Sequence, residues 1–182
     1  MSHRQAQHQL LLYPAYRLIV VRDQDNDAGV GADAAIAEAQ EGIAASTGYE
    51  LYIHCAQDLL KVHATLEIWD DTPYPDSQVE QWGTPRTFRL ECPSGEMSMG
   101  TPTGEAIGAD LPAGPGIYTI DLTHRGRDEA DRLRKRIMVR YDTIPLDQLP
   151  DELEPHAGIE QYRIRMWWHA PLPEEDDEDL DD

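Results

Sequence analysis

Histidine, cysteine and carboxylate side chains are the groups in this sequence that could hold a metal ion or activate a nucleophile. The closest histidine and cysteine group is His54, Cys55 and His63. His54 and Cys55 are adjacent, so on a strand they point to opposite faces and cannot bind one ion together. His54 and His63 could meet only as a cross-strand pair on a polar face. Such a pair is typical of a protein surface, and we predict no metal site at these residues.

The segment Asp23-x-Asp25-x-Asp27-x-Gly29 comes nearest to a calcium-binding loop. Such a loop places alternating acidic ligands before a bidentate Glu. That Glu is not in the right place here, and Asp33 is better suited to cap the helix that follows. The sequence therefore predicts neither a bound metal nor any other cofactor.

Catalytic motifs are also missing from the sequence. It contains no Gly-x-Ser-x-Gly elbow, phosphate loop or dinucleotide fingerprint, and the Gly-rich segment Gly100–Gly104 is interrupted by Pro102. Cys55 and Cys92 each end an apolar alternating run, which favours buried thiols in a reducing compartment over a redox pair. We predict no catalytic residue and a protein that is not an enzyme.

Charge is the strongest indicator of the class of partner. The 182 residues include 35 Asp and Glu against 15 Lys and Arg, which gives a formal net charge of −20. The segment Glu174–Asp182 holds 8 of these acids, so the rest of the chain still carries 27 acids against 15 bases. Such a charge repels nucleic acid and anionic membranes and attracts basic protein surfaces.

The two ends of the chain are polar. The first residues contain no apolar stretch with a cleavage site, and no run approaches the roughly 18 apolar residues of a membrane span. We therefore expect a cytoplasmic protein without a membrane partner. Because blocks of like charge stay solvated, residues 171–182 are predicted to form a disordered acidic tail, and residues 1–9 a flexible N-terminus.

Alternation of apolar and polar residues predicts a mainly β fold. The alternating runs are 49–55, 62–69, 88–92, 118–122 and 162–168. The first two are expected to pair as a hairpin, and the more continuous run Leu10–Val21 to form one long strand with Pro14 at an edge or bulge. Gly and Pro cluster between the runs, so the chain is predicted to fold as a single antiparallel β-sandwich domain at residues 10–170.

Two segments depart from the strand pattern. The Ala-rich segment Asp33–Ala45 predicts one short N-terminal helix that Asp33 caps. A charged insertion precedes the last strand: Arg125–Arg140 holds 7 of the 15 bases, interleaved with acids. These charges are expected to pair locally or with the acidic tail rather than to bind phosphate. The loop Pro145–Pro155 is expected to form a short helix or a docking element.

Tryptophans on polar strand faces are the best candidates for a contact surface. Trp69 and Trp167 occupy such positions, and Asp70 and Asp71 follow Trp69 directly. Aromatic residues surrounded by acids often mark contact sites. The predicted partner-binding residues are Glu67, Trp69, Asp70, Asp71 and Trp167. The alternative is that another layer of the protein, such as the 33–45 helix or the other sheet, covers these tryptophans.

The order of several segments resembles the competence protein J family of bacterial β-sandwich proteins. The segments are Leu12–Val20, the short helix with Gly48, the two alternating runs, a Trp-containing loop leading to Arg86–Leu90, Leu111–Tyr118 and Tyr162–Trp168. The resemblance covers residues 10–169, but the Arg125–Gly158 excursion and the acidic tail depart from it. It implies similarity to the inhibitor of the DNA-entry nuclease of competent cells and to immunity-type proteins.

These observations favour a non-catalytic, acidic protein-binding module of inhibitor or immunity type. Its partner would be a basic protein such as a nuclease or a toxin, whose phosphate-binding cleft carboxylates could occupy. One alternative is a β-sandwich that binds a small molecule or carbohydrate on Trp69, Trp167 or Trp82. A further alternative is a hydrolase with an unrecognised carboxylate or metal site.

Overall fold

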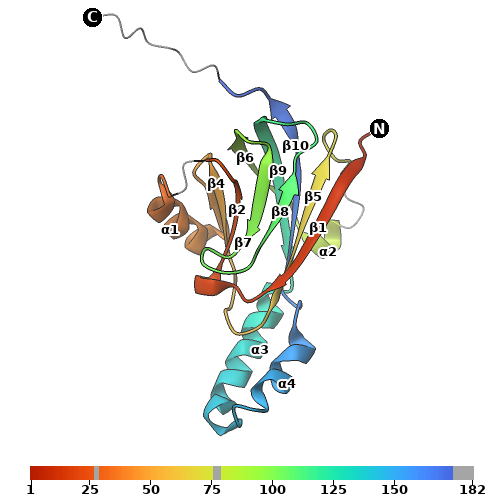
Figure 1. The fold of residues 1–182 in the computed structure, drawn as a ribbon. Helices are drawn as coiled ribbons and strands as arrows, with labels where there is room; N and C mark the ends of the chain where they lie inside the picture. Colours follow the sequence, from red (N-terminus) through yellow and green to blue (C-terminus); the bar gives the residue numbers. More distant parts are fainter. Residues whose placement is uncertain (27–28, 76–78, 174–182) are drawn as a thin grey trace, which may run out of the picture.

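The computed structural model describes residues 1–26, 29–75 and 79–173 (Figure 1). Its strands are β1 (Arg4–Leu12), β2 (Leu18–Asp23), β3 (Ala44–Ser46), β4 (Glu50–His54), β5 (Val62–Trp69), β6 (Arg86–Cys92), β7 (Glu96–Gly100), β8 (Ala106–Asp110), β9 (Gly116–Arg125) and β10 (Gln161–Ala170). Its helices are α1 (Ala32–Gly42), α2 (Val79–Trp82), α3 (Arg127–Arg140) and α4 (Leu149–Leu153).

The strands form two five-stranded sheets. Sheet A has the order β1-β5-β10-β9-β6, and sheet B has the order β3-β4-β2-β7-β8. The inner faces of both sheets contribute to one apolar core, which includes Leu66, Ile120 and Ile164 of sheet A and Val21, Ile53 and Met99 of sheet B. The alternation therefore predicted the mainly β character correctly. The expectation of purely antiparallel pairing was wrong for one pair, because β10 runs parallel to β5.

The N-terminal segment is a paired strand over most of its length. Residues 4–12 form β1, which lies antiparallel to β5 with Gln7 opposite Glu67 and Leu12 opposite Val62. The expectation of a flexible segment at residues 1–9 therefore does not hold from Arg4 onward. Backbone hydrogen bonds to β5 hold this edge strand, and they do not require apolar side chains.

The run Leu10–Val21 is broken in two, contrary to the prediction of one long strand. Pro14 ends the pairing of β1, and its carbonyl accepts a hydrogen bond from the Arg17 N–H at 2.8 Å. Tyr16 and Arg17 both adopt positive φ, at 57° and 60°, a region that L-residues rarely occupy outside turns. This turn carries the chain from sheet A to sheet B.

The predicted hairpin between residues 49–55 and 62–69 does not form. β4 pairs with β2 and β3 in sheet B, whereas β5 pairs with β1 and β10 in sheet A. Both runs do place their apolar side chains in the common core, as at Leu51 and Leu66. Alternation determines which face of a strand is buried, but it does not determine which strands pair with it.

The helices also differ in detail from the expected single helix. α1 begins at Ala32 with Gly31 as its N-cap, so Asp33 lies in the first turn and is not the cap. It ends at Gly42, because Ile43 adopts φ 80°. α3 and α4 form within the charged insertion and the Pro145–Pro155 loop. None of the helices in the described ranges is long and apolar enough to cross a membrane.

Helices α3 and α4, with the turns beside them, form a helical lobe at residues 127–156. Figure 1 shows it projecting from one end of the sheets, opposite the end at which β10 finishes. A buried carboxylate holds the joint: Glu160 accepts hydrogen bonds from Ala56 N–H (2.7 Å), Tyr162 O–H (2.5 Å) and the Gln57 side chain (3.1 Å). Arg127, at the start of α3, lies 3.7 Å from the same carboxylate.

Candidate partner-binding site

Two of the predicted residues, Trp69 and Trp167, are neighbours in sheet A. They are partners in the parallel pairing of β5 with β10, so their side chains lie on the same face. The residues before them, Ile68 and Met166, point into the core. The tryptophans therefore lie on the outer face, as the sequence pattern predicts. Trp167 is nevertheless buried, at 8% exposure, whereas Trp69 is partly exposed.

The carboxylate of Glu67 is used inside the protein. Its Oε1 accepts a hydrogen bond from the Arg4 guanidinium at 3.2 Å, and its Oε2 accepts one from the Trp69 indole N–H at 3.1 Å. Glu67 is only 8% exposed. Its charge is therefore paired and largely removed from solvent. This arrangement orients Trp69 and Arg4.

Asp70 and Asp71 are exposed at the end of β5. The His3 backbone N–H donates to Asp70 Oδ1 at 2.6 Å, and His3 Nδ1 lies 3.3 Å from Oδ2. The backbone hydrogen bond from His3 is the main reason why the pKa of Asp70 lies below its usual value. Asp71 Oδ1 accepts the N–H of Thr72 at 2.6 Å. Both carboxylates are accessible, and Asp70 is held in position.

The segment that follows β5 is tied to the outer face of sheet A. Arg165, buried on β10, donates to the Tyr74 carbonyl at 3.4 Å and pairs with Asp121 at 3.5 Å. Tyr74 itself is exposed. The expected covering layers were helix 33–45 or the other sheet, but α1 packs on β3 and β4 of sheet B. The Arg165 contact places the chain after β5, and not α1, against this face of sheet A.

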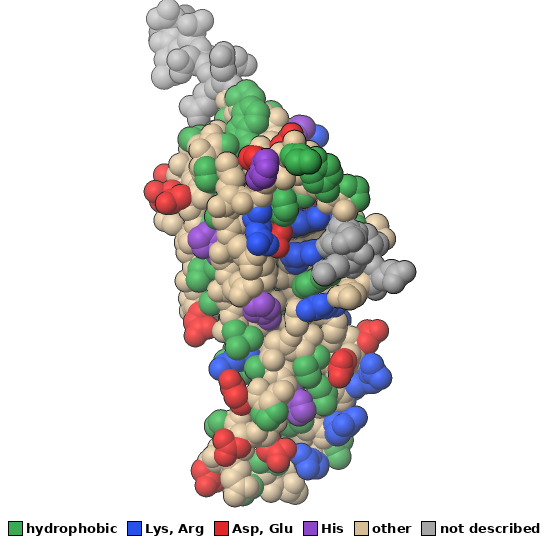
Figure 2. Space-filling model, turned by 90° about the vertical axis from the view of Figure 1, so that its right-hand side faces the viewer, with side chains coloured by type: hydrophobic (Ala, Val, Ile, Leu, Met, Phe, Trp, Pro, Cys, Tyr) green, Lys and Arg blue, Asp and Glu red, His purple; other side chains and the backbone are tan. Residues whose placement is uncertain are grey.

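Figure 2 shows the side of the molecule that carries β1 and α2. Hydrophobic side chains gather toward its upper end, and several Lys and Arg side chains lie below them in its middle. The guanidinium groups of Arg125 and Arg163 lie over the ring of Trp82, at 4.3 and 4.6 Å from its centroid. Trp82 is buried by these contacts, so its ring is not an open platform for a sugar.

Several basic residues of the helical lobe have acidic neighbours. Lys135 pairs with Asp131 at 2.6 Å within α3, and Arg140 pairs with Glu152 of α4 at 2.8 Å. Arg134 lies 3.6 Å from Asp58, in the segment between β4 and β5. The expectation that these charges pair locally agrees with this arrangement. Residues 174–182 of the acidic tail, the other expected partner of these charges, lie outside the described residues.

The metal candidates are separated or used for structure. His54 lies in sheet B and His63 in sheet A, so they are not a cross-strand pair. Asp23 is buried and accepts hydrogen bonds from Ser94 Oγ (2.7 Å) and the Gly95 N–H (3.0 Å), which hold the turn between β6 and β7. Asp27 lies outside the described residues. Across residues 1–26, 29–75 and 79–173, no three His, Cys, Asp or Glu side chains cluster as metal ligands would.

The sequence matches no protein-family model and no curated protein. The structure is similar to that of ComJ from Bacillus subtilis, described as an inhibitor of the DNA-degrading activity of NucA. The TM-score is 0.54 at 12% identity, over 93% of this chain and 99% of ComJ. It is also similar to the protein of crocagin biosynthetic gene J, with a TM-score of 0.52 at 11% identity over the same shares of the chains.

This likeness confirms the resemblance to competence protein J at the level of the fold. The excursion at residues 125–158, which departs from the expected pattern, is the helical lobe and the segment that joins it to β10. The partner-binding residues are not transferred by a likeness at this identity. Their assignment depends on the geometry of the end of β5.

Proposed function

We propose that this chain is a non-catalytic protein-binding module of inhibitor or immunity type that acts in the cytoplasm on a basic protein such as a nuclease or toxin. The observation that carries the proposal is the composition of one end of sheet A. There Trp69, Asp70 and Asp71, called the acidic end from here on, combine two exposed carboxylates with a partly exposed indole ring. Residues 174–182, with 8 acids, are joined to the chain beyond β10, which finishes at the same end (Figure 1).

The acidic end suits a surface that normally binds phosphate. Carboxylates accept charge-assisted hydrogen bonds from Lys and Arg much as phosphate oxygens do. The His3 N–H holds Asp70 ionised and oriented, so a partner would meet a preformed acceptor. The net charge of −20 adds long-range attraction for a basic protein. Charge would therefore govern association, and the indole of Trp69 would anchor the complex.

Glu67 and Trp167 belong to the same proposed site as a supporting layer. Glu67 fixes the Trp69 indole through its hydrogen bond, and Trp167 is the neighbour of Trp69 in the parallel strand pair. Both residues are buried, so they would act on the partner through Trp69. ComJ, which shares the fold, is described as an inhibitor of a nuclease's DNA-degrading activity. That description supports a non-catalytic role and a nuclease partner for this chain.

The test is a binding experiment with a purified basic nuclease, for which NucA, the target of ComJ, is the first choice. In biolayer interferometry, the double variant Asp70→Asn/Asp71→Asn should slow association by roughly tenfold at low ionic strength and flatten its salt dependence. The matched control is Glu105→Gln/Asp110→Asn, which removes two exposed charges from the β8 region of sheet B. If both double variants slow association equally, only net charge matters and the acidic end is not the binding site.

Two further variants separate the anchor from the charge. Trp69→Ala should mainly speed dissociation, because the loss of a buried aromatic contact acts on the off-rate. Deletion of residues 174–182 should slow association while leaving the melting temperature nearly unchanged. Unchanged rates for folded Trp69→Ala and Asp70→Asn/Asp71→Asn proteins would eliminate this face as the contact. The Pro145–Pro155 segment would then be the next candidate.

A further inference from the structure

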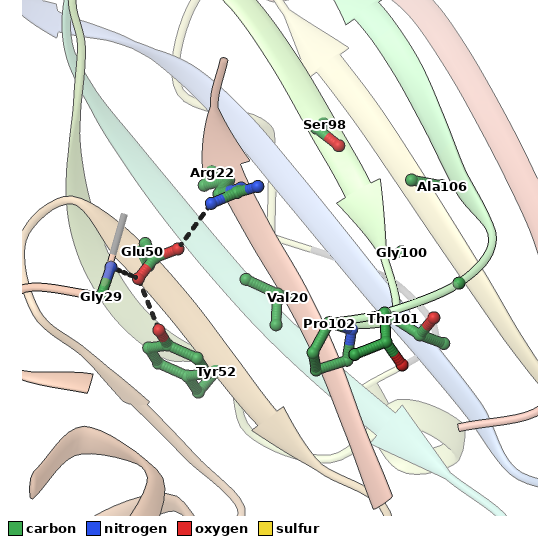
Figure 3. A pocket seen from close by; sticks show the side chains of 12 residues that line it. Val20, Arg22, Gly29, Glu50, Tyr52, Ser98, Gly100, Thr101, Pro102 and Ala106 are labelled. Carbon is green, nitrogen blue, oxygen red and sulfur yellow. Dashed lines mark hydrogen bonds and ion pairs between the residues drawn. The ribbon is translucent and has the colours of Figure 1, made fainter. Parts of the chain in front are cut away.

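The outer face of sheet B contains a cleft that the proposed partner binding does not use. α1 packs on β3 and β4, and the cleft of 440 Å³ opens over the neighbouring strands β4, β2, β7 and β8. Its lining includes Val20, Arg22, Glu50, Tyr52, Ser98 and Thr101 (Figure 3). A volume of several hundred Å³ is the usual size of a small-molecule site.

Strand register divides the floor of the cleft into two rows. In one row, Tyr52 lies beside Val20, Val20 beside Gly100, and Gly100 beside Ala106. The centre of this row is apolar, and no side chain rises from it at Gly100. Gly100 cannot carry a side chain, because a Cβ there would lie 2.1 Å from the Glu105 carbonyl oxygen. The tight β7–β8 turn therefore keeps this part of the floor open.

The second row is polar and lies next to the first. Glu50 lies beside Arg22, and Arg22 beside Ser98. Both oxygens of Glu50, which is 3% exposed, are already engaged. Oε1 accepts from Arg22 at 3.3 Å, and Oε2 accepts from the Tyr52 hydroxyl at 2.5 Å and from the Gly29 N–H at 3.0 Å. Figure 3 shows these three contacts converging on one carboxylate.

Hydrogen-bond donors are what this row offers to a ligand. The Arg22 side chain is 43% exposed, and Glu50 engages one of its nitrogens, Nη1, out of five N–H groups on a guanidinium. Ser98 is the neighbour of Arg22 in the pairing of β2 with β7. Burial, together with the hydrogen bond to Glu50, raises the pKa of Tyr52. The Tyr52 hydroxyl therefore stays protonated, and it donates its hydrogen bond to Glu50. Arg22 and Ser98 are therefore the groups positioned to receive an anion.

The turn at the end of the cleft also contains a buried polar group. Thr101 Oγ1 is buried and has no hydrogen-bond partner among the described residues. Buried hydroxyl groups are normally satisfied in folded proteins. The Thr101 hydroxyl is closed off from solvent, so a ligand in the cleft would find its polar partners at Arg22 and Ser98.

We propose that this cleft binds a small organic carboxylate, whose apolar body lies over the row Tyr52, Val20, Gly100 and Ala106 and whose carboxylate contacts Arg22 and Ser98. A bidentate contact with a guanidinium is the preferred mode for a carboxylate. The protein carries a net charge of −20, which disfavours unspecific binding of anions. Saturable binding of such a ligand would therefore report a specific site. The site is independent of the acidic end, which belongs to sheet A.

Phenylacetate and its uncharged amide, phenylacetamide, test the proposal as a matched pair of probes. Titrated into the ¹⁵N-labelled full-length protein, phenylacetate should cause saturable NMR shifts at the amides of residues 20–22 and 98–106. Phenylacetamide should bind at least about tenfold more weakly, because a hydrogen bond to a charged group is lost. Equal affinity for the two probes would overturn the assignment of a carboxylate ligand. Absence of saturable shifts at these positions would overturn the site.

Variants of the cleft complete the test. Ala106→Phe fills the apolar row from an exposed position on β8 and should abolish the shifts, whereas Ala113→Phe, at an exposed position in the β8–β9 turn, should leave them unchanged. Arg22→Gln should weaken phenylacetate binding at least tenfold while phenylacetamide binding changes little. Retained binding of phenylacetate by a folded Ala106→Phe protein contradicts the proposal. This variant decides the matter even where Arg22→Gln unfolds the protein.

Discussion

The indole N–H of Trp69 donates a hydrogen bond to the carboxylate of Glu67, two residues earlier on β5, over 3.1 Å. Residues two apart on a strand share a face, so this contact is local in sequence. The second oxygen of Glu67 is held by Arg4 from the neighbouring strand β1. One buried carboxylate thus joins the N-terminal strand to the residue proposed to anchor a partner.

Replacement of Trp69 by Phe should measure this link. Phe keeps an aromatic ring but removes the N–H donor, which leaves one oxygen of a buried carboxylate without its partner. We expect a loss of about 1–3 kcal/mol in the free energy of unfolding, measured by urea denaturation. Trp168→Phe is the control, because Trp168 is 39% exposed and should change stability by less than about 0.5 kcal/mol. Equal losses in the two variants would show that the hydrogen bond to Glu67 adds nothing measurable to the free energy of unfolding.

The joint of the helical lobe gives a second prediction. Glu160 is buried and receives three hydrogen bonds in addition to its pair with Arg127. Glu160→Ala leaves Arg127 without that partner and should cost about 3–5 kcal/mol of unfolding free energy. Glu154→Ala removes an exposed partner of Lys61, 3.3 Å away, and should cost at most about 1 kcal/mol. A small effect of Glu160→Ala in chemical denaturation would mean that the lobe is held by its apolar contacts alone.

Sequence patterns predicted the strand faces well and the strand partners poorly. Residues such as Leu51, Leu66 and Ile164 lie in the core as their alternation indicates. Pairing depends on contacts between distant segments, and a period of two residues is the same for every candidate neighbour. β7 and β8 were missed for a different reason. Gly100 and Gly108 give them the composition of a loop, and only the pairing with β2 extends the sheet over them.

At the candidate site, too, the sequence predicted the direction of side chains but not the contacts between distant segments. The outward direction of Trp69 and Trp167 follows from alternation, but their exposure does not. It depends on contacts such as the one between Arg165 and the Tyr74 carbonyl, which brings a later segment onto the sheet. The cleft on sheet B had only one sequence signal: Glu50 and Tyr52 stand on the polar side of their strand. That Arg22 lies beside Glu50 is visible only from the β2–β4 register.

The cysteines should be unreactive in the native protein. Cys55 and Cys92 are fully buried free thiols, and burial raises the pKa of both. The thiolate is the reactive form, so a thiol-specific reagent should label neither residue at pH 7.5 within minutes. Addition of denaturant should release both thiols, which is the control for the reagent. Rapid stoichiometric labelling without denaturant would contradict the prediction and reopen the question of a nucleophile.

Half-buried histidines should make the protein less stable as the pH falls below neutrality. The pKa of His124 lies below its usual value of 6.5, mainly because burial disfavours the cation and further because Arg127 and Arg86 repel it. His54 and His63 shift in the same direction, also mainly through burial. At pH 5 to 6.5 the unfolded chain therefore binds more protons than the folded protein. The stability that these neutral histidines contribute is fully present above pH 6.5, and it is lost as the pH falls through their lowered pKa values.

Urea unfolding at several pH values between 7.5 and 5 should show this decline, and His124→Gln should reduce its slope. His169→Gln is the control, because His169 is exposed at the end of β10. The lowered pKa values of Asp70 and Asp131 do not interfere, since carboxylates lose stabilisation only below their usual value of 3.8. Stability that is constant down to pH 5, or a slope that His124→Gln and His169→Gln change equally, would show that His124 is as free to ionise in the folded protein as in the unfolded chain.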